Sequence, residues 1–161
     1  MNKTVFILGG GIMQLPSIKI AKSKGFRVIV ADANPNAEGR TYADHFAQVD
    51  LKDLVGMVEA AEYYRDLFGL HGIFTAGTDF STTVAYVAER LKLPGITYET
   101  ACDATNKARM RKKFKEHNLP CPDFITLSEN DEPSMVLRTL SFPLVVKPVD
   151  SMGSRGVRRL D

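Results

Sequence analysis

Thr4-Val-Phe-Ile-Leu-Gly-Gly-Gly11 opens the chain with a mostly apolar run that ends in three glycines. An apolar run without alternation is typical of a strand that is buried on both faces of a parallel sheet. Glycine reaches the positive-φ conformations that a tight turn from a strand into a helix requires. This segment therefore predicts the first strand and the first turn of an α/β fold.

Outward from this segment, short β-rich runs alternate with helical patterns. Further strands are predicted at Phe26–Ala31, which ends at Asp32, at Phe46–Val49 and at Gly72–Thr75. Helices are predicted at Ile12–Lys24, at Leu54–Phe68 and from Asp79 to Leu91, with Asp53 and Asp79 as N-caps and Gly25 as a C-cap. Four strands, each followed by a helix or a turn, predict a doubly wound, Rossmann-like parallel sheet over residues 1–96.

The pattern changes over residues 97–161. A helical stretch with a strongly basic middle is predicted at Thr97–His117, and Leu119-Pro120-Cys121-Pro122 breaks it. A strand at Phe124–Leu127, a helix at Pro133–Leu140, a strand at Pro143–Lys147 and a strand-like run at Val157–Leu160 follow. The last run would be an unpaired edge with nothing after it to pack against. Residues 97–161 are therefore expected to be the incomplete start of a second domain.

The bulk composition excludes some classes of protein. Of 161 residues, 44% are hydrophobic and 25% charged, which is ordinary globular composition, and a net charge of +2 indicates neither nucleic acid nor a membrane surface as a partner. No apolar run approaches the roughly 20 residues of a membrane span, and no signal peptide is evident, so the expected location is the cytoplasm. Cys102 and Cys121 have neither metal-ligand nor redox-motif spacing, and no disulfide is expected between them.

The glycines after the first strand allow more than one interpretation. A nicotinamide-dependent oxidoreductase is one alternative, but its fingerprint needs a glycine at the sixth position, where this chain has Gln14. We favour a tight turn, in which the backbone N–H groups of Gly10 and Gly11 could hold an anionic substrate group. Asp32 and Asp79 follow the ends of strands, where open α/β sheets bind ligands, and they complete the set of candidate substrate-binding residues.

The segment from Pro143 to Val157 is the sharpest single signal. An apolar strand ends at Lys147, whose compact ammonium suits phosphate oxygens. The loop that follows contains Gly153 and Gly156, which let successive N–H groups turn toward one anion, and the hydroxyl donors Ser151 and Ser154. It is not a Walker A loop, because the lysine precedes the glycines. Taken alone, the pattern fits an ordinary hairpin loop equally well.

Together these motifs resemble the ATP-grasp superfamily. Asn106-Lys107 precedes the Leu119-Pro120-Cys121-Pro122 break, and Phe142-Pro143-Leu144-Val145-Val146-Lys147-Pro148 leads directly into Ser151-Met152-Gly153-Ser154-Arg155-Gly156-Val157. The chain is most similar to the carbamoyl-phosphate-synthase-like branch, of which phosphoribosylamine–glycine ligase is a close relative. The resemblance implies a Rossmann-like pre-ATP-grasp domain over residues 1–96, followed by the beginning of an ATP-grasp domain over residues 97–161.

The resemblance also implies an activity. Lys107 and Lys147 would contact ATP phosphates, and residues 151–156 would form a lid over them. A small-molecule carboxylate would be activated by phosphoryl transfer from ATP and Mg²⁺, and the acyl phosphate would be attacked by an amine or ammonia. The metal ligands would lie beyond this chain, so the 161-residue piece itself is expected to be inactive, and a homodimer is left open. The alternative is a non-catalytic Rossmann-like module that binds a metabolite or a partner chain.

Overall fold

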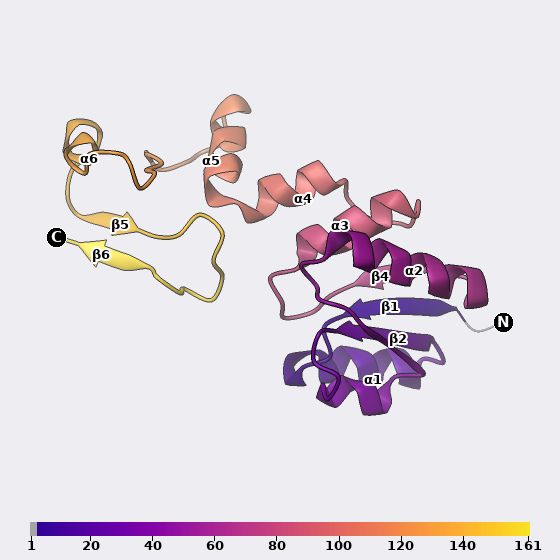
Figure 1. The fold of residues 1–161 in the computed structure, drawn as a ribbon. Helices are drawn as coiled ribbons and strands as arrows, with labels where there is room; N and C mark the ends of the chain where they lie inside the picture. The colour runs from indigo at the N-terminus through magenta and orange to yellow at the C-terminus, as the bar shows by residue number, and fades with distance from the viewer. Residues whose placement is uncertain (1–2) are drawn as a thin grey trace. The chain divides into compact units, whose positions relative to one another are not determined.

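The computed structural model describes residues 3–161 and divides the chain between Ala101 and Cys102 (Figure 1). This division lies inside helix α4 (Tyr98–Thr105), a few residues beyond the boundary at 96/97 that the sequence suggested.

A four-stranded parallel sheet forms the centre of the first unit. Its strands are β1 (Thr4–Leu8), β2 (Arg27–Asp32), β3 (His45–Gln48) and β4 (Gly72–Phe74), in the order β3-β2-β1-β4. Strand β1 is paired on both edges, so that Phe6 lies opposite Ile29 on one side and Ile73 on the other. The predicted doubly wound parallel sheet is therefore confirmed.

Helices cover both faces of this sheet, as Figure 1 shows. On one face, Phe6 and Leu8 pack with residues of α2 (Leu54–Phe68) and α3 (Ser81–Arg90). On the other face, Ile7 packs with residues of α1 (Leu15–Ser23). Successive side chains of a strand point to opposite faces, so a strand covered on both sides must be apolar at nearly every position. This explains the opening run of the sequence.

The helix ends agree only in part with the sequence patterns. The Asp53 carboxylate accepts the N–H of Gly56 at 3.0 Å and caps α2, as predicted. A β-carbon on Gly56 would lie 2.5 Å from the Asp53 Oδ2 atom, so this glycine makes room for the cap. The prediction that Asp79 caps the next helix is wrong. Helix α3 begins at Ser81 with Phe80 as its N-cap residue, and no described side chain makes a cap hydrogen bond there.

The first helix is shorter than predicted. Residues Ile12–Gln14 form a 3₁₀ turn, η1, and α1 starts at Leu15 with Pro16 in its first turn. A second 3₁₀ segment, η2 (Glu38–Tyr42), lies within the loop between β2 and β3. Gly25 follows the C-cap of α1 with a φ of 78°, which confirms its predicted role in ending the helix.

The second unit contains α5 (Lys107–Glu116), α6 (Ser134–Thr139), β5 (Leu144–Val146) and β6 (Arg158–Leu160). The helix predicted over 97–117 is interrupted at Asn106, where the backbone is extended and the side chain caps α5. The predicted strand at 124–127 is absent, because none of the described strands pairs with it. The last strand, expected as an unpaired edge, is paired on one side, with Leu160 opposite Leu144 in an antiparallel hairpin.

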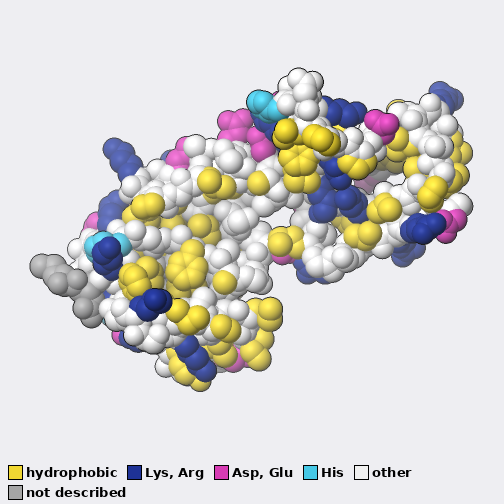
Figure 2. Space-filling view, turned by 180° about the vertical axis from the view of Figure 1, so that it is seen from behind, with side chains coloured by type: hydrophobic (Ala, Val, Ile, Leu, Met, Phe, Trp, Pro, Cys, Tyr) yellow, Lys and Arg dark blue, Asp and Glu magenta, His cyan; other side chains and the backbone are white. Residues whose placement is uncertain are grey.

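Apolar side chains of the second unit are left uncovered by the described residues. No residue from 102 to 161 is buried, and Val145 in β5 and Leu137 in α6 are 59% and 61% exposed. The space-filling view shows hydrophobic side chains at the surface of this unit (Figure 2). An isolated two-stranded hairpin is at best marginally stable in water, so this unit lacks a core of its own. Within residues 3–161, no helix is long and apolar enough to cross a bilayer.

Asp44 ties β3 to the preceding elements. One carboxylate oxygen pairs with the Lys22 ammonium at 2.5 Å, and the other accepts the N–H of Val28 at 2.8 Å. Burial raises the pKa of Asp44, but the hydrogen bonds and charges of its partners outweigh burial and hold that pKa below its usual value. A carboxyl group whose pKa is lowered by folding stabilises the protein above its unfolded pKa of about 3.9, and this contribution is lost as the pH falls through the folded pKa.

Acid should therefore weaken the fold in part through Asp44. Between pH 5 and pH 3, the free energy of unfolding of Asp44→Asn is expected to fall less than that of the wild type. The difference should be about 1 kcal/mol or less, because both side chains are about one-third exposed. Urea unfolding at several pH values measures it, with the exposed Asp66→Asn as the control. If the free energies of unfolding of wild type and Asp44→Asn fell in parallel with pH, Asp44 would not contribute to the acid sensitivity of the fold.

Candidate functional site

Two loops meet at the carboxyl ends of β1 and β4. Strands β2 and β3 lie on one side of β1, and the next strand, β4, lies on its other side. The direction in which strands are added to the sheet therefore reverses between β1 and β4. Open α/β sheets bind ligands outside the carboxyl ends of strands at such a point. Gly9 and Gly77 have φ values of 94° and 68°, and a β-carbon on Gly77 would lie 3.3 Å from that of Met13. The two loops are therefore in close contact.

A buried polar network joins these loops. Gln14 is 1% exposed, and its Oε1 atom accepts the N–H of Ala76 at 3.0 Å while its Nε2 atom donates to the Thr75 hydroxyl at 3.4 Å. The Thr75 hydroxyl donates to the carbonyl of Leu8 at 2.8 Å and pairs with the Thr78 hydroxyl at 2.6 Å. The end of β1, the first turn and the loop after β4 are thus linked through side chains.

The structure brings together two of the four candidate substrate residues. The N–H of Gly10 donates to the Asp32 Oδ2 atom at 2.7 Å, and the other carboxylate oxygen accepts the N–H of Asn34 at 2.9 Å. The N–H of Gly39 donates to the carbonyl of Gly10 at 2.6 Å, and a β-carbon on Gly10 would lie 2.9 Å from that of Ala37. Gly10 and Asp32 therefore hold the loop after β2 against the first turn.

The other two candidates, Gly11 and Asp79, lie next to open space or solvent. A β-carbon added to Gly11 would have no heavy atom within 4 Å, and Asp79 is exposed. An open hollow of about 580 Å³ lies beside the same turn. It is lined by Leu15, Pro35, Asn36, Ala37, Glu38, Arg40, Thr41 and Tyr42. None of these residues was among the site residues that the sequence predicted.

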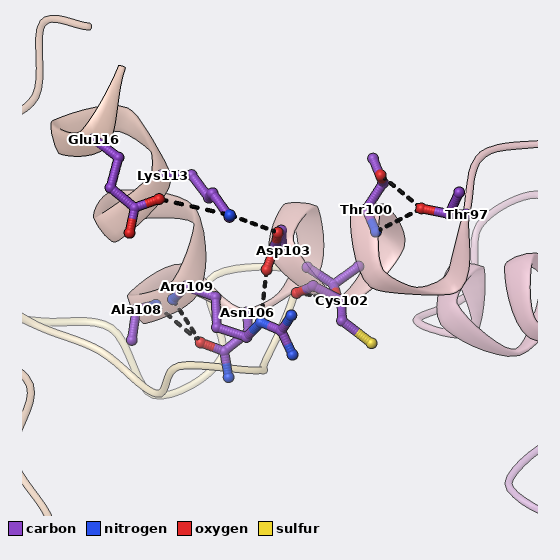
Figure 3. Close-up of polar contacts among 10 residues, drawn as sticks. Thr97, Thr100, Cys102, Asp103, Asn106, Ala108, Arg109, Lys113 and Glu116 are labelled. Atoms are coloured by element: carbon purple, nitrogen blue, oxygen red, sulfur yellow. Dashed lines mark hydrogen bonds and ion pairs between the residues drawn. The ribbon is translucent and has the colours of Figure 1, made fainter. Parts of the chain in front are cut away.

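In the second unit, side-chain contacts fix the start of α5 (Figure 3). Asn106 Oδ1 accepts the N–H groups of Ala108 and Arg109 at 3.0 and 3.1 Å. Arg109 donates to Asp103 at 2.7 Å, across the break between α4 and α5. Lys107 is the first residue of α5, so its position is determined by this cap and ion pair.

Lys107 contacts the loop that follows β5. Its backbone N–H donates to the carbonyl of Val149 at 2.7 Å, and its ammonium donates to the carbonyl of Ser151 at 2.5 Å. Lys147 follows the last residue of β5 and is exposed. The structure thus brings Lys107 to the start of the loop that the sequence had associated with it.

The loop itself contains three residues in the left-handed region. Gly153, Ser154 and Gly156 have φ values of 64°, 58° and 73°. A β-carbon on Gly156 would lie 2.8 Å from the Pro148 side chain, so the loop folds back onto the residue after Lys147. Within the loop, the N–H groups of Arg155 and Val157 donate to the carbonyls of Met152 and Ser154, so the segment is a series of tight turns.

Comparison with known proteins gives relatives that match most of this chain but only part of their own length. No family model matches. The carbamoyl phosphate synthase large chain of Thermotoga sp. (strain RQ2) is 24% identical over 144 residues, covering 87% of this chain and 13% of the relative. The crystal structure of phosphoribosylglycinamide synthetase from Anaerococcus prevotii matches with a TM-score of 0.70 and 27% identity, covering 93% of this chain and 38% of the other. These relatives are ATP-grasp ligases.

The chain corresponds to the N-terminal part of the ATP-grasp ligases that it matches. A third neighbour shares the fold at 18% identity, with a TM-score of 0.69 over 99% of this chain and 37% of the other. It is the biotin carboxylase domain dimer of Hydrogenobacter thermophilus 2-oxoglutarate carboxylase, solved with MgADP, ADP and bicarbonate. The chain thus spans well under half the length of each of these ATP-grasp relatives.

Proposed function

We propose that this chain is the N-terminal portion of an ATP-dependent ligase that joins a carboxylate to an amine or ammonia. One observation carries the proposal: in a chain whose relatives are ATP-grasp ligases, Lys107 lies against the start of a loop rich in left-handed residues. A positive charge beside a glycine-rich loop with backbone and hydroxyl donors suits the phosphates of a nucleotide.

The second unit fits a nucleotide in its donor chemistry. Lys107 and Lys147 supply positive charge, and Ser151, Ser154 and the loop amides supply hydrogen-bond donors for phosphate oxygens. Bound ATP with Mg²⁺ would supply the phosphoryl group that activates the carboxylate, giving an acyl phosphate. The role of the loop would be to cover the phosphates and exclude water.

We place the carboxylate-binding part of the first unit at the junction of β1 and β4. The accessible backbone at Gly11 and the exposed Asp79 would border this part of the site. Gly10 and Asp32 would support it indirectly, because their hydrogen bond holds the first turn.

The remaining parts of the proposal concern the whole protein. Within residues 3–161, no three His, Cys, Asp or Glu side chains are close enough to hold a metal ion together, and we propose that the Mg²⁺ ligands lie elsewhere. The 161-residue chain alone would then be inactive. A homodimer is proposed by analogy with the dimeric biotin carboxylase domain, which shares the fold.

The test begins with the native protein. Antibody capture from its own cells, followed by intact mass spectrometry, should give a mass well above 17.8 kDa. The captured protein should form ADP only when a carboxylate is added, and hydroxylamine should trap the acyl phosphate as a hydroxamate. ADP formation that ignores every carboxylate tested, or ATP turnover by the 161-residue chain alone, would contradict the proposal.

A further inference from the structure

Gln14 is the uncharged side chain at the position where a dinucleotide fingerprint would have its last glycine. It is almost fully buried. Its oxygen and its nitrogen both have partners, and both partners belong to the segment after β4. The side chain therefore connects two segments that are more than 60 residues apart in sequence.

Without the Gln14 amide, the N–H of Ala76 would lose its acceptor. An N–H that is shielded from water and loses its acceptor destabilises the fold, and the half-buried Ala76 has the Gln14 oxygen as acceptor. Thr75 is anchored by its own bond to the carbonyl of Leu8. Ala76 is the next residue along, and the left-handed Gly77 follows it immediately. Gln14 thus acts at the point where the loop leaves the sheet.

We infer that Gln14 is a positioning residue that holds the loop at 76–79 at a fixed spacing from the first turn. The spacing matters because Gly11 on one loop and Asp79 on the other border the same junction. The expected consequence, that this spacing decides which carboxylate fits, rests on the proposed function. The spacing itself is a property of the 161-residue chain and can be measured without a ligand.

The decisive variant is Gln14→Met, which keeps the length and volume of the side chain and removes both hydrogen bonds. The rescue variant is Gln14→Glu. Burial raises the pKa of a carboxyl group, and its protonated form has the acceptor and the donor of an amide in the same places. Loop order in Gln14→Glu should therefore return toward wild type as the pH falls from 7 to 5, which a loss of packing alone would not produce.

The measurement is amide hydrogen exchange by NMR on the 161-residue chain. In Gln14→Met, the protection of the Ala76 amide should fall about ten-fold or more, which corresponds to the loss of one buried hydrogen bond. The matched control is Thr4→Val, which removes a fully buried hydroxyl at the opposite end of β1. Unchanged protection at Ala76 in Gln14→Met, or an equal fall in Thr4→Val, would overturn the inference.

A second arm separates this inference from the proposed function. Acetate, used as a carboxylate probe, should shift the amide resonances of Gly11 and Gly77 in a saturable way, with several-fold weaker binding in Gln14→Met. If acetate shifts neither resonance in the wild type, the proposal of a carboxylate site at this junction is wrong. The exchange result still decides whether Gln14 positions the loop.

Discussion

Replacing Lys147 with Ala in the complete protein is expected to lower kcat/KM for ATP by about 10²-fold or more. Loss of one charge that faces transferring phosphate oxygens typically costs this much, because such interactions act in a site from which water is excluded. Lys147 follows the last residue of β5, so a rigid element sets the position of its backbone. Its side chain is exposed, so shortening it should disturb the fold little.

Two further variants test whether the effect depends on the position of the lysine and on the shape of its charged group. Lys112→Ala removes an exposed lysine from α5 in the same unit and should leave ATP use unchanged. Lys147→Arg keeps the charge but replaces a point charge by a planar fork, and we expect partial activity. Steady-state ADP release over a range of ATP concentrations measures all three variants. An unchanged kcat/KM for ATP in Lys147→Ala would remove this residue from the nucleotide site and would weaken the ligase assignment.

The fold of the first unit could be predicted because local signals and burial agree there. The apolar run of β1 is needed on both faces of the sheet, and the Asp53 cap depends only on neighbours within one turn. Asp79 misled the prediction because two oxygen-bearing side chains precede α3. Helix α3 begins one residue later than a cap at Asp79 requires, and the Thr78 hydroxyl, which pairs with that of Thr75, accepts the N–H of Phe80.

The second unit was less predictable for a different reason. Residues 124–127 have the composition of a strand, but a strand exists only where another strand pairs with it. At Asn106, a local signal was present and was overlooked: an asparagine between two helical runs is a strong N-cap. The contact of Lys107 with Ser151 joins residues 44 apart, and only the order of motifs pointed to it.

The candidate site shows the same limit. Gly10 and Asp32 were selected for contact with a substrate, and their places at the ends of β1 and β2 were read correctly from the sequence. Their bond to each other could not be read, because it depends on the parallel register of the two strands. In the sequence, Gln14 was noted only because it occupies a position where the dinucleotide fingerprint needs a glycine. Its partners lie more than 60 residues away, and no periodicity of the sequence connects them.

Gly39→Ala is expected to destabilise the first unit by about 2 kcal/mol, within the usual range for overpacking a core. A β-carbon on Gly39 would lie 2.6 Å from the Ile18 Cδ1 atom and 2.9 Å from the carbonyl oxygen of Gly10. The buried Ile18 side chain can move only at a cost in packing, and the oxygen belongs to the backbone of the first turn. The N–H of Gly39 donates to that same oxygen, so relief of the clash would lengthen this hydrogen bond.

Two comparisons separate this clash from a general loss of glycine. Gly11→Ala lies in the same turn with a φ of −70° and no atom within 4 Å of the new β-carbon, so its free energy of unfolding should stay within about 0.5 kcal/mol of wild type. Ile18→Val in the Gly39→Ala background removes the closer contact but leaves the one with Gly10. Rescue should therefore be partial, as measured by urea unfolding. Complete rescue would show that the side-chain contact alone mattered, whereas wild-type stability of Gly39→Ala would show that the loop after β2 is not held against the first turn. Partial rescue would indicate that the backbone of the turn, which also carries Gly10 and Gly11, cannot give way.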